Sequence, residues 1–406
     1  MKTYLFIFGR HPALSLAELY AFAETEQLTL TVTGLSSEVA VVTGIPEAQA
    51  ETLLMRLAGT IKIAVVLGSL VPPEKNDVVA WTNLLQPFVK NHPLRSFGMS
   101  YYGAAQLLPG VTPQEHIALT LKKEFREASG KVRWVSGRGK PLSSVQVDKN
   151  HMVGETGSEF IIAVSSAEEA YIAKTLSVQP FEDWSNRDFG RPSRDARSGM
   201  LPPKLARLMV NLLGLPHEGT LLDPFCGSGT VLMEALLSGW TSVIGSDKSA
   251  KAVMDSQKNM EWLNNSQRIA TSGCSFFTRS VEELTALIPE RSVAAIVTEP
   301  DLGPALREPP TTEEAMRIAK TLVPLYKQAL ETFAHILSPG GRVVIVFPCW
   351  ITQDHEEVVL PLRETDLPTG LRERLLLDWS TTKNTFIYRR PDQFVARKIV
   401  SFEAVL

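Results

Sequence analysis

The stretch LLDPFCGSGTVLMEALLSGWTSVIGSD, residues 221–247, predicts a strand, a tight turn, a helix and a second strand that ends in an acid. The CGSGT turn of residues 226–230 carries glycines that permit positive φ and let a ligand approach the backbone closely. Helical periodicity then runs to Gly239, and Asp247 closes the following strand. The stretch therefore predicts the ligand-binding end of a parallel α/β sheet.

A glycine turn that opens a helix, with an acid after the next strand, is the geometry of a nucleotide site in which the acid meets ribose hydroxyls. The turn lacks the Gly-Lys-Ser/Thr of a phosphate-binding loop and the third glycine of the dinucleotide fingerprint. Asp223 precedes it, in reach of a cationic ligand. That suits S-adenosylmethionine (SAM), because its sulfonium and ammonium groups are positive. The alternative is an ordinary α/β turn without a ligand.

Length and composition restrict the class of protein that this sequence can encode. A chain of 406 residues, 44% hydrophobic and 21% charged, is expected to form two or three soluble globular domains. It has no apolar run long enough to span a bilayer, and its first residues lack a signal-peptide cleavage site. The isolated cysteines Cys226, Cys274 and Cys349 favour a reducing cytoplasm and argue against a zinc site, so no metal is expected. Because the net charge is −3, any nucleic-acid signal must be local.

Residues 1–72 alternate strands and helices in the order βαββαβ, which is the ferredoxin-like pattern. Ser15 to Glu18 predicts a capping box that opens the first helix, and Pro46 is expected to open a second helix that runs through Leu57. The strands are expected at residues 4–8, 28–32, 39–43 and 61–67.

Residues 73–180 form a second α+β block with a local excess of positive charge. Helices are expected at 78–89 and 113–128, and strands at 97–101, 132–135, 143–147, 160–164 and 172–178. Between Ala118 and Asn150, eight basic and three acidic residues give a net charge of +5, and the SGRGK bend could grip phosphates. A solvated helix face is the alternative. Together with two arginines of the next segment, the candidate phosphate contacts are Lys122, Arg126, Arg133, Arg138, Lys140, Arg191 and Arg194.

Residues 181–200 are expected to be a linker, and residues 201–406 a second α/β region. Pro202 and Pro203 open a helix there, and Pro324 is expected to kink or break a later one. The other expected elements are helices at 250–263 and 313–337, strands at 275–278, 294–297 and 343–347, and a terminal antiparallel hairpin at 385–388 and 394–402.

Polar groups follow three of the predicted strands, and ligands of open parallel sheets bind at such carboxyl ends. The three ends are residues 223–230, Asp247 and residues 298–303. A methyl donor at the first two leaves the third for the acceptor. Glu299, with Pro300 and Asp301 beside it, is therefore the candidate for catalysis, the alternative being an acid that caps a helix or is merely solvated.

The chain resembles the THUMP-domain tRNA guanosine-N2 methyltransferases, the family that modifies guanosine at tRNA position 10. The resemblance rests on YLFIFGRHPALSLAEL (4–19), RPSRDARSGMLPPKLARLMVNL (191–212), LLDPFCGSGT (221–230) and SPGGRVVIV (338–346). It implies a C-terminal class I methyltransferase (Rossmann-like) domain behind N-terminal α+β domains. The expected organisation is a ferredoxin-like domain at 1–72, a THUMP RNA-binding domain at 73–180, a linker at 181–200 and the methyltransferase domain at 201–406.

Residue by residue, the resemblance implies a SAM site and an acceptor site. The implied SAM contacts are Asp223, Phe225, Cys226, Gly227, Ser228, Gly229, Thr230 and Asp247. Ser280 stands where the family has an adenine-contacting Asp. At the acceptor, the family's Asp-Pro-Pro-Tyr-Gly is replaced by Glu-Pro-Asp-Leu-Gly, residues 299–303. Leu302 offers no π-face to a flipped base, so Trp184, Phe189 or Phe347 would have to supply the platform.

The resulting hypothesis is methyl transfer from SAM to the exocyclic N2 of a guanosine in tRNA, with the base flipped into the site. Asp301 adds a second carboxylate beside Glu299. Alternatives are another RNA such as ribosomal RNA, Cys226 as a methyl-accepting nucleophile, and an RNA-binding protein without catalysis. A small-molecule methyltransferase would leave the chain before residue 180 without a role. The expected partner is tRNA and not a membrane; some family members act with a small partner protein.

Overall fold

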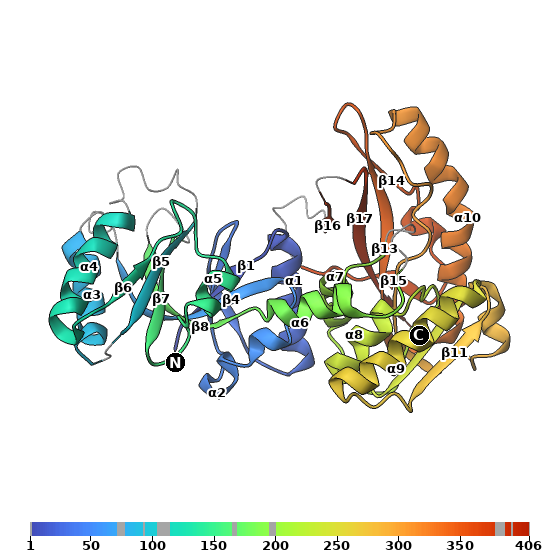
Figure 1. Cartoon of the computed structure of the whole chain (residues 1–406). Helices are drawn as coiled ribbons and strands as arrows, with labels where there is room; N and C mark the ends of the chain where they lie inside the picture. Colours follow the sequence, from blue (N-terminus) through green and yellow to red (C-terminus); the bar gives the residue numbers. More distant parts are fainter. Residues whose placement is uncertain are drawn as a thin grey trace. The chain divides into compact units, whose positions relative to one another are not determined.

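The structure is a computed structural model that describes residues 2–70, 78–91, 94–103, 114–164, 169–194, 200–377, 386–390 and 393–405. The chain separates into two compact units, Met1–Leu16 with Gln27–Glu182 and Ala17–Glu26 with Asp183–Leu406. Each unit contains one sheet (Figure 1). Residues 195–199 of the expected linker, and the first residues of the helix expected at 113 and the strand expected at 385, lie outside the described residues.

The first unit is built on an eight-stranded sheet in the order β2-β3-β1-β4-β8-β7-β5-β6. Its strands are β1 (Tyr4–Phe8), β2 (Thr31–Leu35), β3 (Val39–Thr43), β4 (Thr60–Leu70), β5 (Ser96–Tyr102), β6 (Arg133–Val135), β7 (Gly157–Val164) and β8 (Ala170–Val178). β4 pairs antiparallel with β1 on one side and with β8 on the other. The two blocks that the sequence separates near residue 72 therefore contribute to one continuous sheet.

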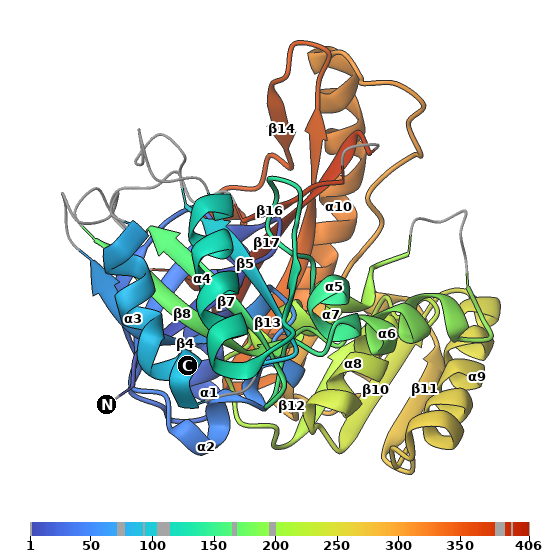
Figure 2. The same ribbon diagram turned by 60° about the vertical axis from the view of Figure 1, so that its left-hand side comes forward.

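Helices cover this sheet and seal its apolar residues. They are α2 (Glu47–Ala50), α3 (Val78–Asn91), α4 (Gln114–Ser129) and α5 (Ser144–Lys149). The helix α1 (Pro12–Thr25) is divided between the two units after Leu16. α3 and α4 lie side by side (Figure 2), and their apolar faces pack on β4 and β5. Trp81, Leu85, Phe125 and Phe160 are buried in the resulting core, where the Phe125 and Phe160 rings stack at 6.3 Å. The amphipathic spacing of both helices thus explains their position.

Three local predictions in this unit are wrong. The first helix begins at Pro12 and not at a capping box, because the Ser15 hydroxyl lies inside it and donates to the His11 and Gly59 carbonyls. The helix expected from Pro46 is two short pieces, α2 and the 3₁₀ turn Leu53–Met55. The strand expected at 143–147 is α5. A capping box forms there between Ser143 and Gln146, and it overrides the alternating pattern.

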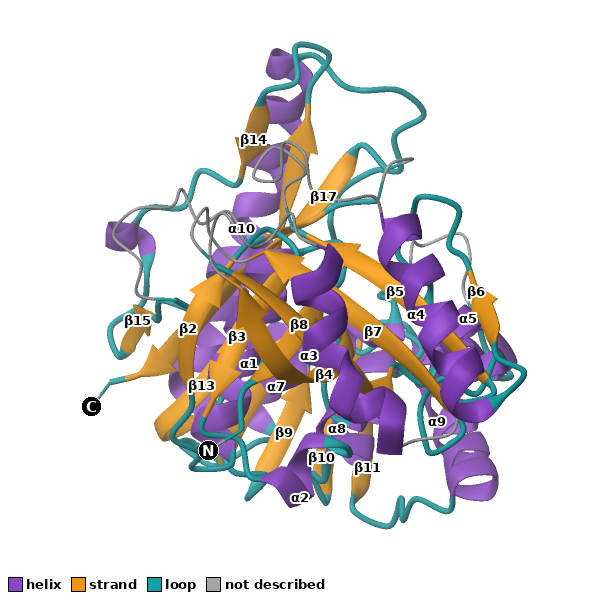
Figure 3. Cartoon of the chain, turned by 90° about the vertical axis from the view of Figure 1, so that its left-hand side faces the viewer, coloured by secondary structure: helices purple, strands orange, loops and turns teal. Residues whose placement is uncertain are grey.

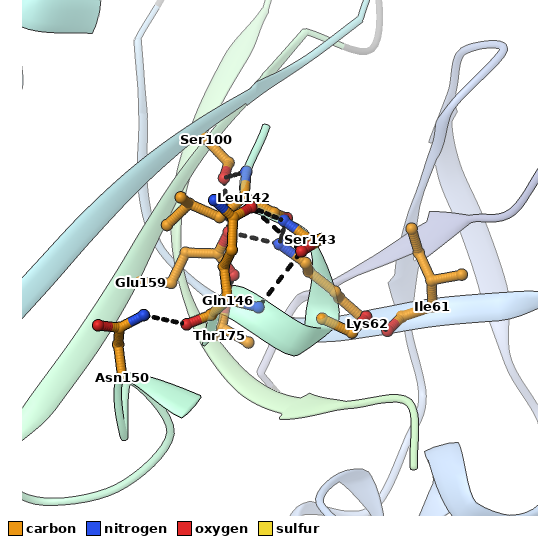
Figure 4. A network of polar contacts seen from close by, with 10 residues as sticks. Ile61, Lys62, Ser100, Leu142, Ser143, Gln146, Asn150, Glu159 and Thr175 are labelled. Atoms are coloured by element: carbon orange, nitrogen blue, oxygen red, sulfur yellow. Dashed lines mark hydrogen bonds and ion pairs between the residues drawn. The ribbon is translucent and has the colours of Figure 1, made fainter. Parts of the chain in front are cut away.

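A buried polar network ties β4 to the strands beyond it (Figure 4). The Lys62 ammonium donates to Glu159 Oε1 at 2.5 Å and to the Leu142 carbonyl at 2.6 Å. Ser100 Oγ and Thr175 Oγ1 donate to the same carboxylate, at 2.5 and 2.7 Å. Lys62 and Glu159 are fully buried, so the pair is held by hydrogen bonds on both of its members.

The second unit is built on a nine-stranded sheet whose main path is β11-β10-β9-β12-β13-β17-β15. Its strands are β9 (Thr220–Asp223), β10 (Ser242–Asp247), β11 (Cys274–Thr278), β12 (Val293–Thr298), β13 (Leu337–Ile351), β14 (Glu357–Val359), β15 (Leu371–Glu373), β16 (Ile387–Tyr388) and β17 (Val395–Ala404). β9 to β13 run parallel, and β17 pairs antiparallel with β13, β15 and β16. Figure 3 shows β9, β10 and β11 in this order. The predicted parallel sheet with antiparallel strands at one side is confirmed.

The helices of this unit are α6 (Phe181–Ser185), α7 (Pro203–Asn211), α8 (Thr230–Ser238), α9 (Ala250–Gln267) and α10 (Thr312–Ile336). Two predictions fail here. The first half of the expected linker is helical, since α6 continues into a π-helical turn at Asn186–Gly190. α10 also runs unbroken through Pro324. Its apolar face is buried against β12 and β13, and this packing outweighs the hydrogen bond that proline removes.

Candidate active site

The glycine turn lies between β9 and α8, and its shape depends on two left-handed glycines. Gly227 has φ +50° and Gly229 has φ +82°. A Cβ on Gly229 would lie 2.3 Å from Ser256 Oγ, so only glycine fits without displacing α9. The Cys226 amide donates to the Ser246 carbonyl at 2.9 Å, which fixes the turn to β10.

Asp247 connects this turn to the start of α9. Its Oδ2 accepts from the Gly227 amide at 3.1 Å, and its Oδ1 accepts from the Ser249 amide at 2.9 Å. A carboxylate has about four acceptor positions, so the two bonds leave capacity for a ligand's hydroxyls. The structure thus places the predicted ribose-binding acid beside the predicted turn.

A second clamp on the turn comes from Asn259 of α9. Its Nδ2 donates to the Ser228 carbonyl at 2.8 Å and to the Ser193 carbonyl at 2.9 Å, while its Oδ1 accepts from the Ser193 amide at 2.9 Å. Asn259 is fully buried, so these bonds are shielded from water. No sequence pattern indicates this role, because a single Asn within a helix carries no distinguishing signal.

Arg191 lies in the interior and not on an RNA-accessible surface. It is buried, and its Nη1 donates to Thr230 Oγ1 at 2.6 Å at the start of α8. Burial lowers the pKa of its guanidinium, and Asp188 opposes that shift. Arg191 therefore supports the glycine turn and does not belong with the candidate phosphate contacts.

A cavity of about 610 Å³ lies at the carboxyl ends of the strands and joins all three predicted ends. The predicted residues that line it are Phe225, Cys226, Gly227, Ser228, Thr230, Asp247, Ser280, Glu299, Pro300 and Asp301. Asp223 and Gly229 do not line the cavity themselves but lie behind the residues that do. Leu302 and Gly303 complete the acceptor side, and Lys248, Lys251 and Asp255 line the side formed by α9.

Asp223 is a buried carboxylate behind the cavity wall. Its Oδ1 accepts from Thr298 Oγ1 at 2.6 Å and from the Phe225 amide at 3.2 Å. Burial raises the pKa of Asp223 to about 7, and these hydrogen bonds oppose the rise. The carboxylate links the end of β9 to the end of β12, so it couples the turn to the acceptor segment.

Glu299 is held by an arginine that the sequence analysis did not identify. Arg397 of β17 donates from Nε to Glu299 Oε2 at 2.5 Å and from Nη2 to Oε1 at 3.1 Å. The Arg397 side chain is 3% exposed and that of Glu299 is 13% exposed. Burial raises the pKa of Glu299, whereas the Arg397 charge and hydrogen bonds lower it. The two residues are 98 positions apart, so no local pattern could have paired them.

The residues after Glu299 form a turn without an aromatic ring, in which Pro300 is buried. Asp301 is exposed and its Oδ1 accepts from the Gly303 amide at 2.8 Å. The buried Tyr326 hydroxyl donates to the Asp301 carbonyl, at 3.1 Å, or to the Val346 carbonyl, at 3.2 Å. Leu302 is half-buried in the cavity wall.

The three aromatic rings expected to replace the missing platform differ in exposure. Trp184 and Phe347 are buried in the interior, whereas Phe189 is 63% exposed. The Arg194 guanidinium lies over the Phe189 ring at 4.8 Å. Phe189 is thus the accessible ring of the three, although it does not line the cavity.

Ser280 lines the cavity, but its side chain is already engaged. Its hydroxyl and its amide both lie 2.9 Å from Glu283 Oε2, as the N-cap of a 3₁₀ turn. Glu282 also lines the cavity. The carboxylate on this side of the cavity is therefore two residues along the chain from the position at which the resemblance predicts an Asp.

Of the other candidate phosphate contacts, Arg194 belongs to the second unit and the remaining five lie in the first unit. Lys122 and Arg126 follow one face of α4 and, with Leu119, Lys123 and Glu127, line a shallow hollow. Arg133 is exposed and donates to Asn150 Oδ1 at 2.7 Å. Arg138 and Lys140 are exposed on the bend before α5, where Arg138 takes φ +54°. All of these basic side chains except the half-buried Lys122 are exposed, so they are open to a polyanion.

The second unit has the Rossmann-like fold of class I methyltransferases: parallel strands, a glycine turn after the first of them, and a cavity at their carboxyl ends. Within the residues that the structure describes, no helix combines the length and apolarity needed to cross a bilayer.

Comparisons with known proteins agree with this class. Residues 191–353 match the family described as "RMKL-like, methyltransferase domain". A tRNA (guanine(10)-N2)-dimethyltransferase of Pyrococcus abyssi is 32% identical over 162 residues, which are 40% of this chain and 41% of that protein. The alignment thus spans less than half of the relative's length.

Two solved structures resemble the whole chain. TrmN from Thermus thermophilus gives a TM-score of 0.57, covering 99% of this chain and 100% of that chain at 18% identity. SMU.472 complexed with SAH gives 0.51, covering 100% of this chain and 99% of that chain at 13% identity. Because both sequence identities are low, the structural similarity establishes the fold and nothing beyond it.

Proposed function

We propose that this protein transfers a methyl group from SAM to the exocyclic N2 of a guanosine in tRNA, at position 10. The observation that carries the proposal is the single cavity that joins the glycine turn, Asp247 and Glu299. The Pyrococcus abyssi relative, which modifies guanine-10 N2 of tRNA by its name, supports the choice of acceptor. Of the alternatives, methylation of another RNA and RNA binding without catalysis become outcomes of the test below.

The side chains around the cavity fit a cationic donor. Its wall carries more carboxylates than ammonium groups, namely Asp247, Asp255, Glu282, Glu299 and Asp301 against Lys248 and Lys251. In the proposal, Asp247 accepts hydrogen bonds from ribose hydroxyls, and the glycine turn admits the donor close to the backbone. When bound, SAM supplies a methyl group on a positively charged sulfur. The solved structure of SMU.472, whose fold is similar, is a complex with SAH. This supports the proposal that the cavity binds SAM.

The acceptor side needs a hydrogen-bond acceptor, because a guanine amine delocalises its lone pair into the ring and is a poor nucleophile. The Glu299 carboxylate can accept from the NH₂ group and orient its lone pair toward the donor. The flipped base would lie against Leu302, with apolar contact in place of ring stacking. Ring stacking is worth about 1–3 kcal/mol per base. Because Phe189 does not line the cavity, this stabilisation would have to come from contacts of the bound RNA.

The first unit is proposed to bind the tRNA, with residues 1–72 as a ferredoxin-like domain and residues 73–180 as a THUMP domain. Exposed basic residues on α4 and on the bend before α5 would contact phosphates, and such contacts read backbone shape more than sequence. The isolated cysteines and the tRNA substrate together favour a cytoplasmic location.

Purified protein, tritiated SAM and matched tRNA test the proposal. Nucleoside mass spectrometry should find methylated N2-guanosine at position 10, and a tRNA with another base there should not be labelled. Glu299→Gln should slow the reaction by at least about 100-fold, whereas the exposed Glu290→Gln serves as the matched control.

Labelling of ribosomal RNA in place of tRNA would reassign the substrate. RNA binding without any heat of SAM binding in calorimetry would remove the enzymatic proposal altogether.

A further inference from the structure

Glu299 lines the cavity, and its pairing with Arg397 has geometry that a general structural ion pair does not require. Two parallel donors of one guanidinium meet the two oxygens of one carboxylate, at 2.5 and 3.1 Å. The guanidinium is itself oriented, because Nη1 donates to Gln393 Oε1 at 3.2 Å. A bidentate fork of this kind fixes position as well as charge.

Position matters here because Glu299 stands where the related motif carries the shorter Asp. The extra methylene adds a rotatable bond and displaces the carboxylate, and a displacement of about 1 Å can cost on the order of 100-fold in rate. Arg397 approaches from β17, on the other side of β13 from β12, and takes up both oxygens. The arginine thus fixes the longer side chain in a single position.

The fork also leaves room for a ligand. A carboxylate offers about four acceptor positions, and the bidentate pair uses one on each oxygen. Glu299 lines the cavity and its side chain retains 13% exposure. An acceptor amine entering the cavity can therefore donate to the carboxylate while Arg397 stays bound.

Burial would favour protonation of Glu299 without this arginine, because burial is what raises the pKa of its carboxyl group. The titratable groups that interact with Glu299 are Asp223 and Tyr326, and Asp301 follows two residues along the chain. Arg397 is the cation that lowers the pKa of Glu299 against burial. Protonation would place a hydrogen on the carboxyl group and reduce its capacity to accept from the amine.

We propose that Arg397 is the positioning residue of the acceptor site: it holds Glu299 in one place and ionised, so that the carboxylate orients the guanosine amine. This inference rests on the function proposed above. As the N–CH₃ bond forms, the S–CH₃ bond breaks and its electron pair stays on sulfur, which becomes a neutral thioether. The surplus proton on nitrogen passes to water. Glu299 orients the amine and stabilises the positive charge that develops on it, while Arg397 holds the carboxylate in place through two hydrogen bonds.

The test compares Arg397→Met, Arg397→Lys and the matched control Arg372→Met. Arg372 also pairs with a carboxylate on the same sheet, Glu403, but away from the cavity. The turnover rate on tRNA is measured from pH 5 to 9 at saturating SAM and RNA, with SAM affinity by calorimetry alongside. In Arg397→Met, the pH below which the turnover rate falls should rise by about 1–3 pH units. The reason is that burial then raises the pKa of Glu299 without opposition from the arginine. Arg397→Lys, which keeps the charge but not the fork, should lose rate with a smaller shift.

A profile for Arg397→Met that keeps the wild-type limb and is only scaled down would overturn the proposal. If Arg397→Met does not fold, Glu299→Gln with Arg397→Met leaves no unpaired buried charge and replaces it. That double variant should be no slower than Glu299→Gln alone, and a further tenfold loss would count against the inference. A wild-type protein that methylates no RNA would instead remove the proposed function, and the inference with it.

Discussion

Replacing Gly229 by alanine tests the geometry of the glycine turn. The residue has φ +82°, where an L side chain costs about 1–2 kcal/mol. The new Cβ would lie 2.3 Å from Ser256 Oγ and 3.3 Å from Ser256 Cα. Ser256 is fully buried, so it has little room to move, and overpacking of this kind costs about 1–3 kcal/mol. Gly229→Ala should therefore lower the free energy of unfolding by about 2–5 kcal/mol.

Two matched variants separate the contributions. Gly227 has φ +50°, but a Cβ there would meet no atom within 4 Å, so Gly227→Ala should cost only the backbone strain of about 1–2 kcal/mol. Adding Ser256→Ala to Gly229→Ala removes the clashing oxygen and should return the cost to that same level. Both effects arise in the turn that contacts the proposed donor.

Urea unfolding followed by tryptophan fluorescence measures these free energies, and calorimetry measures SAM affinity. The affinity should fall further for Gly229→Ala than for Gly227→Ala, because α9 must shift in the former. Equal costs for the two alanine variants, or no recovery on adding Ser256→Ala, would refute the steric reasoning.

Three further predictions concern buried and exposed charges. Lys62→Met should destabilise the protein in urea by about 3–5 kcal/mol, because Glu159 stays buried without its cation, whereas Lys62→Met with Glu159→Leu should recover most of that loss. The folded pKa of Asp223, about 7 against 3.8 unfolded, gives stability that is present at low pH and lost as pH rises through 7. Asp223→Asn should remove the resulting fall of about 2–3 kcal/mol between pH 5 and 8 in urea titrations at each pH. Arg138→Ala and Lys140→Ala should each weaken tRNA binding in filter assays and reduce its salt slope by about 1, and unchanged slopes would exclude them as phosphate contacts.

The sequence was sufficient for the parts of the fold that follow from local patterns. The strand-turn-helix-strand stretch of residues 221–247 formed as predicted, because glycine positions and apolar periodicity are local signals. Most of the site residues that it carries line one cavity. Ser143 shows where such patterns fail, since one capping box turned an alternating run into a helix.

The parts that could not be predicted depend on contacts between distant segments. Arg397 meets Glu299 only because β12 and β17 both pair with β13, one on each side, and nothing around residue 397 indicates this. Asn259 and Arg191 are likewise placed by packing around the glycine turn. Arg191 also shows that a basic residue in a polar stretch can be interior, because its hydrogen bond to Thr230 is not visible in composition.

The antiparallel pairing of β4 with β8 bears on how such proteins can be recombined. Cutting the chain after residue 72 would remove β1 to β4 and leave the nine residues of β8 as an unpaired edge strand. Unpaired N–H and C=O groups along an apolar edge strand can pair with other chains and so promote aggregation. The two N-terminal blocks must consequently be inherited, transplanted or deleted together, even though each one looks like a self-sufficient module on its own.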